Sequence, residues 1–271
     1  MANCAETEKF ARKLRLDVLK MINFGRSSHI GAVFSMADIL AVLYKSVLRY
    51  RSAEPAWPER DRFILSKGHA GAGIYAALAE AVFFPLEWLD SYCADGSLLS
   101  GHVAHKGVPG VELSTGSLGH GLPVGAGMGY SLKLDGNPGR VFVLLGDGEC
   151  AEGTTWETAL FAAHHRLSNL NVIVDHNRMQ GLGFCKDILE VSPLADKWAA
   201  FGWEVFEVDG HSHAELHEVF ARPATDRPRC IVANTVKGKG VSYMENNLAW
   251  HYRTPLEENF DQAMRELGEG C

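Results

Sequence analysis

The chain has 271 residues, of which 46% are hydrophobic, and it carries a formal net charge of −7. This length is enough for one large α/β domain or two small ones. The mild acidity and the dispersed basic residues give no support for a nucleic-acid partner. No uninterrupted apolar run reaches 18 residues and the N-terminus is charged rather than signal-like, so we expect no membrane-spanning helix.

The cysteines are scattered along the chain without the Cys-x-x-Cys spacing of a metal or redox site. Cysteines in this pattern favour free thiols in a reducing compartment, so we expect a cytoplasmic protein. The six are Cys4, Cys93, Cys150, Cys185, Cys230 and Cys271.

The first half of the chain alternates helical patterns with one short apolar strand. Between residues 6 and 23, apolar residues recur at helical spacing, as in Leu14, Val18 and Ile22. A loop of small residues over 25–32 follows. The further expected elements are a helix over about 36–48, a strand over 62–65, a helix over 73–84, a short helix over 86–93, and a short strand over 111–115 in a glycine-dense segment that opens a helix at Gly121.

The centre of the chain carries the strongest pattern. An apolar β-branched run over 141–145 stops at Gly146-Asp147-Gly148, a helix is expected from Gly153, and a second apolar run over 171–175 stops just before Asn177. Because parallel strands joined by a helix end at the same edge of a sheet, Asp147 and Asn177 are expected to lie together. Carboxylate, amide and backbone carbonyl oxygens suit Mg²⁺, which usually also binds substrate phosphates. The residues thus predict a metal-bridged diphosphate site.

The last third of the chain continues the alternation of helices and strands. The expected elements are a helix over 193–201, a strand over 203–209, a helix over 212–221 capped by Ser212 with Glu215 three residues on, a strand over 229–236, and an acidic helix-like tail over 255–271. Lys237-Gly238-Lys239-Gly240 resembles a phosphate loop but lacks the remaining P-loop residues. We find no internal repeat and no clear linker, which predicts a single domain over 1–271.

The motif of Gly-Asp-Gly, 28 residues and then Asn resembles the thiamine-diphosphate-binding motif. Its local text is similar to that of transketolases in particular, and the resemblance extends over essentially the whole chain. SSHIG, SKGHAGA and PGVELSTGSLGHG, which carry His29, His69 and the loop 116–121, all match transketolase signatures. The resemblance implies an α/β fold with a doubly wound, mostly parallel sheet and helices on both faces.

The resemblance also implies site residues for the cofactors thiamine diphosphate and Mg²⁺. It implies that the metal is held by Asp147, Asn177 and the backbone carbonyl of Met179. Cofactor contacts carried over to this sequence are His69, Gly116, Ser117, Leu118, Asp147, Gly148, Glu149, Asn177 and His251. Histidines carried over as catalytic, facing the substrate or the reacting carbon, are His29, His69, His102 and His251.

Several of these residues have plain structural alternatives. A histidine in a small-residue loop, such as His29, is often only hydrogen-bonded to backbone. His120 stands where many transketolases carry Gln, and it is either a further proton carrier or a spacer. Glu152 and Glu157 begin a helix, where acidic residues are ordinary partners of the helix dipole. In transketolases the matching acids lie at a subunit interface.

One required group is absent from the sequence. In transketolases, a Glu from a second domain activates the aminopyrimidine of the cofactor, and arginines of that half hold the sugar phosphate. Full-length transketolases are more than twice as long as this chain. The chain therefore resembles the N-terminal subunit of a split transketolase, and we expect a separate C-terminal subunit in an α₂β₂ assembly without which it is inactive.

Two other functions stay open at this point. One is the α subunit of a 2-oxo acid dehydrogenase, which also pairs Gly-Asp-Gly with Asn, although the histidine loops favour a transketolase. The other is a non-catalytic module that binds thiamine diphosphate. Transfer of a two-carbon ketol unit between a ketose phosphate and an aldose phosphate is the main expectation, with pentose phosphates as default substrates and an unusual branched or amino sugar as the alternative.

Overall fold

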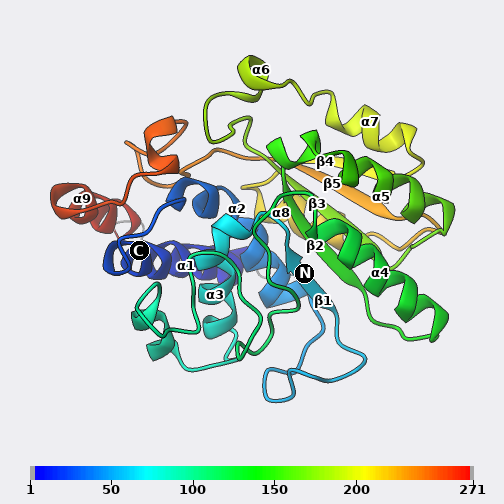
Figure 1. The fold of residues 1–271 in the computed structure, drawn as a ribbon, viewed down its shortest axis with the longest axis horizontal. Helices are drawn as coiled ribbons and strands as arrows, with labels where there is room; N and C mark the ends of the chain where they lie inside the picture. The colour runs from blue at the N-terminus through cyan, green and yellow to red at the C-terminus, as the bar shows by residue number, and fades with distance from the viewer. Residues whose placement is uncertain (1–3, 269–271) are drawn as a thin grey trace.

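The computed structural model describes residues 4–268, which form one five-stranded sheet with helices on both of its faces (Figure 1). All strand pairs are parallel, and the strand order is β1-β2-β3-β5-β4. The expected α/β fold with a mostly parallel sheet is confirmed. Parallel neighbours need crossover connections, which the helices between the strands supply.

The strands agree with the expected ones to within about two residues at each end. Their bounds are β1 Arg62–Leu65, β2 Val141–Gly146, β3 Leu170–His176, β4 Glu204–Asp209 and β5 Arg229–Asn234. The helices are α1 Cys4–Phe24, α2 Ile30–Val42, α3 Gly71–Glu80, α4 Gly121–Leu134, α5 Gly153–His164, α6 Cys185–Ile188, α7 Leu194–Ala200, α8 His213–Ala221 and α9 Glu257–Gly268. Further helical turns, of π type in η1 and of 3-10 type in the others, are η1 Leu43–Val47, η2 Gly68–Ala70, η3 Leu86–Ser91, η4 Gly148–Ala151 and η5 Leu248–His251.

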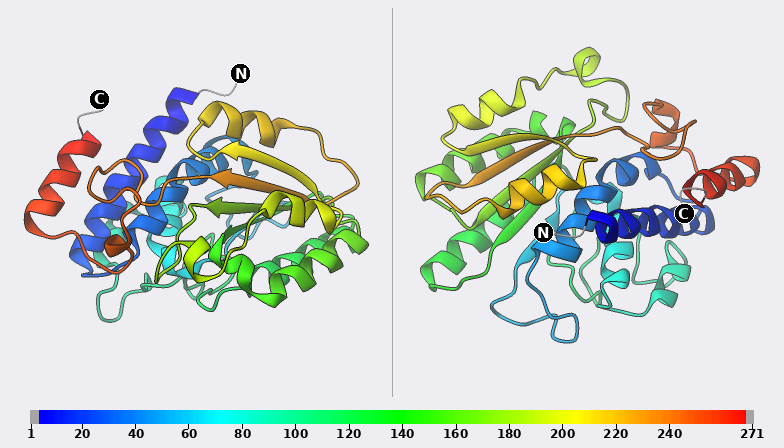
Figure 2. Two further views of the ribbon diagram at one scale, coloured as in Figure 1. Left: turned by 90° about the horizontal axis from the view of Figure 1, so that it is seen from above. Right: turned by 180° about the vertical axis from the view of Figure 1, so that it is seen from behind.

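Two separate hydrophobic cores cover the two faces of the sheet. Along β2, Phe142 and Leu144 pack with α1, α2 and α3 in one core, while Val143 and Leu145 pack with α4, α5 and α7 in the other. This alternation follows from the two-residue period of a strand. Figure 2 shows the two helical layers, with α9 beside α1 at the margin of the first. Burial on both faces explains why the central strands read as continuous apolar runs.

One stretch, Ile30–Val47, is long and apolar enough by length and composition to cross a membrane, with a mean hydropathy of 1.6. In the structure, 83% of this stretch is buried inside the protein. It includes Asp38, whose carboxylate is engaged by neighbouring side chains. These features are those of a core helix.

The predicted loop over 25–32 is confirmed for residues 25–29, but its last three residues are helical and the predicted helix start near residue 36 is wrong. Helix α2 already begins at Ile30. The small residues there serve close packing rather than a loop, since a Cβ on Gly31 would lie 3.2 Å from Cγ of Lys237. The carbonyl of Gly31 also accepts a hydrogen bond from the N–H of Gly238 at 3.0 Å.

The predicted short strand over 111–115 is also wrong, because this segment has no regular secondary structure. The C-terminal end of this segment is held by individual hydrogen bonds of Thr115 rather than by a β-ladder. The N–H of Thr115 donates to the carbonyl of Val103 at 3.1 Å, and its hydroxyl donates to the carbonyl of Leu65 at 2.7 Å. A side chain thus occupies the end of β1 where a further strand residue would pair.

The predicted cap of α8 is confirmed, since Ser212 Oγ accepts a hydrogen bond from the N–H of Glu215 at 3.3 Å. Within residues 4–268 the cysteines are all free. Cys271 and the last residues of the predicted tail lie outside the described residues.

A buried ionic cluster joins α1, α2 and the start of α8. Asp38 accepts two hydrogen bonds from Arg15, at 3.0 and 2.6 Å, and further bonds from His211 and His213 at 2.7 and 3.2 Å. Burial alone would raise the pKa of Asp38, but the Arg15 charge and these hydrogen bonds outweigh it and hold the pKa well below 3.8. The folded state therefore favours the ionised carboxylate.

We expect Asp38→Asn to destabilise the fold by about 3 kcal/mol at pH 7, because it leaves the buried Arg15 without a counter-charge. A depressed pKa stabilises the fold above the carboxyl's ordinary value, and this stabilisation is lost as the pH falls through the folded-state pKa. The difference between wild type and variant should therefore shrink below about pH 4. Urea unfolding followed by circular dichroism between pH 2 and 7 measures both effects.

Glu54→Gln is the matched control, because Glu54 forms an exposed ion pair with Arg51. Its cost should stay below about 1 kcal/mol. Equal stability of Asp38→Asn and wild type at pH 7 would show that the buried cluster contributes nothing.

Candidate active site

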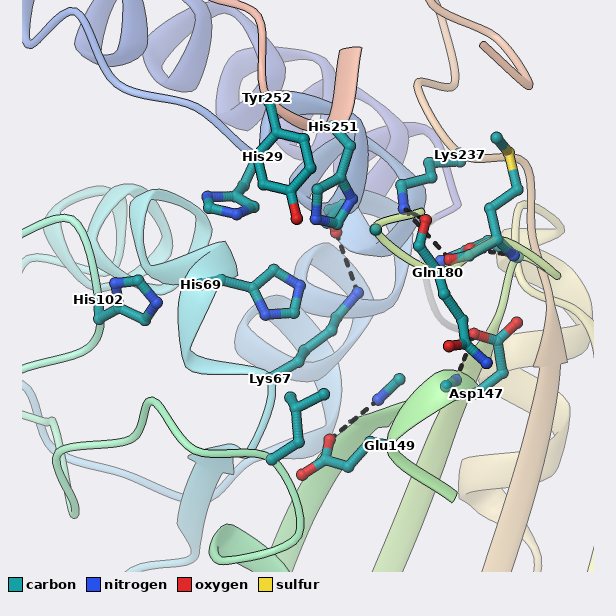
Figure 3. Close-up of a pocket in the computed structure, with 17 residues that line it drawn as sticks. His29, Lys67, His69, His102, Asp147, Glu149, Gln180, Lys237, His251 and Tyr252 are labelled. Carbon is teal, nitrogen blue, oxygen red and sulfur yellow. Dashed lines mark hydrogen bonds between the residues drawn. The ribbon is translucent and has the colours of Figure 1, made fainter. Parts of the chain in front are cut away.

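A cavity of about 320 Å³ opens at the carboxyl edge of the sheet (Figure 3). Strand ends form its floor, and loops that carry histidines form its other walls. The residues that line it are His29, Ala32, Lys67, His69, His102, Leu118, Gly146, Asp147, Gly148, Glu149, Asn177, Met179, Gln180, Gly181, Lys237, His251 and Tyr252. Most of the residues expected at the site are therefore brought together.

Asp147 follows β2 and is almost fully buried, with 2% of its surface exposed. The register pairs Gly146 with Asp175 of β3, which places the next residues of both strands at one edge. Its carboxylate accepts hydrogen bonds from the N–H groups of Gly148 at 2.7 Å and Arg178 at 2.5 Å. Burial, and then the nearby carboxylate of Asp175, raises the pKa of Asp147 to about 6. A cation at this position would stabilise the ionised form of the Asp147 carboxylate.

The amide of Asn177 is held in one orientation. Its Nδ2 donates to Asp175 at 3.2 Å, and its Oδ1 accepts from the N–H of Met179 at 3.0 Å. Met179 is 3% exposed, and its carbonyl accepts a hydrogen bond from Lys237 Nζ at 3.2 Å. One carboxylate, one amide and one backbone carbonyl thus line the same edge.

This donor set fits a small divalent cation. In residues 4–268 there is no group of three or more His, Cys, Asp or Glu side chains arranged to hold a metal. The oxygens of Asp147, Asn177 and Met179 instead match a Mg²⁺ site of the kind completed by phosphate oxygens. These residues would hold the cation, and Mg²⁺ at this position stays a prediction.

Asp175, one residue before the end of β3, is the centre of a buried network. It accepts hydrogen bonds from Lys67 after β1, from Ser35 of α2 at 2.5 Å and from Thr235 after β5. Burial would raise the pKa of Asp175, but Lys67 and these hydrogen bonds lower it overall. The network therefore holds Asp175 ionised and fixes Lys67, whose ammonium also donates to the carbonyl of Ala32 at 3.0 Å.

Lys237 differs from Lys67 in having no carboxylate partner. Its ammonium donates only to the carbonyls of Met179 at 3.2 Å and Gln180 at 3.4 Å among the described residues, although the residue is only 2% exposed. Burial, and then the charge of Lys67, lowers the pKa of Lys237 to about 8. A buried ammonium that lines a cavity and forms no direct ion pair fits an anionic ligand such as a diphosphate.

Glu149 lines the cavity but its carboxylate is already engaged. It accepts hydrogen bonds from the hydroxyl of Ser66 and from the N–H groups of Gly119 at 2.8 Å and Gly146 at 3.2 Å. Burial raises its pKa above the usual value. Its contact with the cofactor stays a prediction, and the structure shows that it ties the glycine-rich loop to β2.

Four histidines gather at the outer end of the cavity. Ring centroids of His29 lie 5.1 Å from His69, 6.1 Å from His102 and 4.9 Å from His251. The N–H of His29 donates to the carbonyl of His251 at 2.8 Å, which joins two loops from opposite ends of the chain. The His29 ring thus lies among the other rings at the cavity, and its role in catalysis stays a prediction.

Burial is the largest cause of a lowered pKa in three of these histidines. The pKa falls to about 4 for His29, and to about 3 for His251, where Lys237 contributes second. For His69 it falls to about 2, with Lys67 as the second cause. These rings are neutral at pH 7, so each offers one hydrogen-bond donor and one acceptor.

The glycine-rich loop contributes less to the described cavity than expected. Leu118 lines it, and a Cβ on Gly116 would lie 3.7 Å from His102. Gly116 and Ser117 are exposed and are not among the described lining residues. Their cofactor contacts stay predictions.

The remaining polar residues that the sequence singled out lie outside the cavity. His120 is exposed, and its Nδ1 is 3.0 Å from the carbonyl of Leu118. Glu152 and Glu157 are exposed at the start of α5, and Glu152 makes no side-chain cap there. A role for these acids at a subunit interface stays a prediction.

Sequence reasoning missed four polar residues that line the cavity, namely Lys67, Gln180, Lys237 and Tyr252. In the sequence, Lys237 stands out only as part of an incomplete phosphate loop. Lys67 directly precedes the Gly-His motif after β1, and a cation in a strand-to-helix turn was the available signal. Nothing local marks Tyr252, whose position depends on long-range packing.

Comparisons with known proteins agree with this geometry. The sequence model described as "Transketolase, thiamine diphosphate binding domain" matches residues 6–269. The chain is 40% identical over 258 residues to the 6-deoxy-6-sulfo-D-fructose transketolase subunit SqwG of a Clostridium species, covering 94% of this chain and 93% of that protein. It is 41% identical over 264 residues to one subunit of the apulose-4-phosphate transketolase of Actinobacillus succinogenes, covering 97% and 96%.

Solved structures give the same result for the fold. Transketolase from Leishmania mexicana superposes with a TM-score of 0.90 at 30% identity, covering 99% of this chain and 42% of that one. Transketolase from Campylobacter jejuni gives 0.91 at 28% identity, covering 98% and 43%. The chain thus spans about two fifths of these transketolases but nearly all of the subunit relatives.

These matches favour a transketolase over a 2-oxo acid dehydrogenase α subunit. The chain belongs to the transketolase family and corresponds to the thiamine-diphosphate-binding, N-terminal subunit of a split transketolase.

Proposed function

We propose that this chain, with a separate C-terminal subunit, transfers a two-carbon ketol unit from a ketose phosphate to an aldose phosphate. The observation that carries the proposal is a cavity with buried charges at one end and neutral histidines at the other. The inner end suits a diphosphate with Mg²⁺, and the outer end suits sugar hydroxyls. Bound thiamine diphosphate supplies a nucleophilic carbon and an electron sink for the transferred unit.

The roles of this chain's own residues follow from their environment. Lys237 would attract the diphosphate, while Lys67 stays paired with Asp175. Asp147, Asn177 and the Met179 carbonyl would hold the cation. The neutral rings of His29, His69 and His251, and the ring of His102 beside His29, exchange protons or hydrogen bonds with substrate hydroxyls. Ser28 Oγ, 2.8 Å from His29 Nδ1, orients that ring.

The partner is proposed from the charges that line the cavity. In the described chain, the charged lining residues are Lys67, Asp147, Glu149 and Lys237, all at the sheet edge. Groups that bind the phosphate of a sugar and the Glu that activates the aminopyrimidine would then come from the second subunit. Relatives named as subunits of transketolases that act on 6-deoxy-6-sulfo-D-fructose or apulose 4-phosphate support this organisation.

We further propose an α₂β₂ assembly in the cytoplasm, with the exposed Glu152 and Glu157 of α5 at an interface. The support for the compartment is the set of free thiols among the described cysteines.

Purification of the tagged chain from its source cell, with thiamine diphosphate and Mg²⁺ present, tests the function. We expect a second chain to co-elute, ketol transfer to appear only in the complex, and native mass spectrometry to give two copies of each chain. Full activity of the chain alone on a sugar phosphate would refute the need for a partner. A complex that binds cofactor but transfers no ketol unit would instead indicate a non-catalytic module.

Asp147→Ala should abolish Mg²⁺-dependent binding of thiamine diphosphate, because it removes the one carboxylate in the proposed cation site. Isothermal titration calorimetry with and without Mg²⁺ measures this. Asp226→Ala is the control, since Asp226 forms only an exposed ion pair with Arg166. Unchanged binding by Asp147→Ala would remove the metal site from the account.

Lys237→Gln should weaken thiamine diphosphate binding roughly tenfold to a hundredfold, the range for a lost hydrogen bond to a charged group. Because the pKa of Lys237 is about 8, its charge is present below that pH and lost above it. Wild-type affinity should therefore fall between pH 7 and 9, and the affinity of the variant should change less. Calorimetry at saturating Mg²⁺ gives both values.

Lys239→Gln is the matched control for this series, because Lys239 lies on the same turn but is 40% exposed and pairs with Glu245 at 3.5 Å. If the two lysine variants bind the cofactor equally well, Lys237 does not contact the diphosphate.

A further inference from the structure

Tyr252 lies at the mouth of the cavity, directly after the catalytic candidate His251. It is 60% exposed, although its ring contacts the buried His251 and the half-buried His29. Within residues 4–268 its hydroxyl makes no hydrogen bond. An aromatic group with a free hydroxyl at the entrance of a polar cavity is suited to contact a ligand.

The ring of Tyr252 is held in place by its neighbours. Its centroid lies 4.5 Å from that of His251 and 5.7 Å from that of His29, both in edge-on geometry. Figure 3 shows the phenol at the outer end of the cavity, with its hydroxyl pointing inward between these histidines and the Gln180 turn.

The opposite side of the mouth has space for this hydroxyl because residue 181 is glycine. A Cβ on Gly181 would lie 2.8 Å from the Tyr252 hydroxyl and 3.2 Å from His251 Nε2. The phenol therefore extends from η5 toward the turn after β3 and narrows the opening between them.

The two rings in contact with Tyr252, those of His29 and His251, are uncharged at pH 7. The charged groups of the cavity lie at the sheet edge, and the pKa values of His29 and His251 keep these rings neutral at pH 7. A substrate portion at this level would be recognised through hydroxyl groups rather than through a phosphate. Polyhydroxylated sugar chains have that chemistry.

We propose that Tyr252 is a specificity-determining residue whose hydroxyl hydrogen-bonds a hydroxyl group of the sugar chain beyond the transferred two-carbon unit. Its ring limits the width of the sugar that the mouth admits at that level. This inference rests on the proposed ketol-transfer function. Tyr252 has no role in holding the diphosphate or the cation, because the groups for both lie at the sheet edge.

The test compares Tyr252→Phe with wild type in the complex with the partner subunit, thiamine diphosphate and Mg²⁺. Donors are a three-carbon 2-oxo acid, hydroxypyruvate, and five- and six-carbon ketose phosphates. We expect KM for the long ketoses to rise roughly threefold to tenfold, as for one lost hydrogen bond between uncharged groups, with KM for hydroxypyruvate and cofactor affinity unchanged. Equal changes for short and long donors, or no change for either, would overturn the proposal.

Tyr252→Ala tests the role of the ring. Widening the mouth should raise kcat/KM for branched ketoses relative to linear ones, compared with Tyr252→Phe. An unchanged ratio would show that the ring does not set the width. Tyr243→Phe is the matched control, because the Tyr243 hydroxyl donates to the Asn259 carbonyl at 2.5 Å outside the cavity, and its substrate preference should equal that of wild type.

A binding measurement separates this inference from the proposed function. A five-carbon alditol phosphate, which lacks the carbonyl, is titrated into the wild-type and Tyr252→Phe complexes by calorimetry. Weaker binding by the variant supports the inference even where no turnover is found, in which case only the proposed reaction fails. Equal binding, or no binding by either protein, overturns the inference.

Discussion

The arrangement of the site depends on the buried carboxylate of Asp175. It collects hydrogen bonds from Lys67 after β1, Ser35 of α2, Asn177 after β3 and Thr235 after β5. A buried ion pair stabilises a structure only where its remaining hydrogen-bonding capacity is satisfied, and here every partner comes from a different loop or helix at the same edge. The network therefore fixes the ends of three strands and the start of α2 relative to one another. The cavity is the space that these fixed ends enclose.

With Asp175 and Lys67 paired, Asp147 and Lys237 remain at this edge as charged groups that form no direct ion pair among the described residues. Asp147 has a raised pKa and Lys237 a lowered one, and in both burial is the main cause. A divalent cation would satisfy the first and a diphosphate the second, while the two ligands would also bind each other. The same electrostatic imbalance therefore accounts for a site that takes both together. It is the physical reason why a cofactor would be anchored here through a metal-bound diphosphate.

The outer half of the cavity is lined by neutral rings rather than by charged groups. Burial keeps the rings of His29, His69 and His251 neutral, so they act as paired donors and acceptors rather than as charges. Such groups are suited to distinguish hydroxyl patterns, and the proposed role of Tyr252 would extend that surface to the mouth. The backbone bond between His29 and His251 joins these loops, which explains why residues so distant in the sequence form one wall. Charged recognition is then left to the proposed partner subunit.

The sequence by itself determined the elements whose causes are local. Continuous apolar runs identified the strands, and Gly-Asp-Gly with Asn177 identified the sheet edge at which the cavity lies, because a parallel sheet brings all strand ends to one side. The histidine motifs likewise led to His29, His69, His102 and His251. Only the tertiary structure decided which of two lysines on one turn faces the cavity, with Lys237 2% exposed and Lys239 40% exposed. It also decided that Tyr252 lies over the mouth and that small residues near Gly31 start a helix. Those outcomes depend on contacts between distant segments, such as Gly31 with Lys237 and Gly181 with Tyr252, which local patterns do not encode.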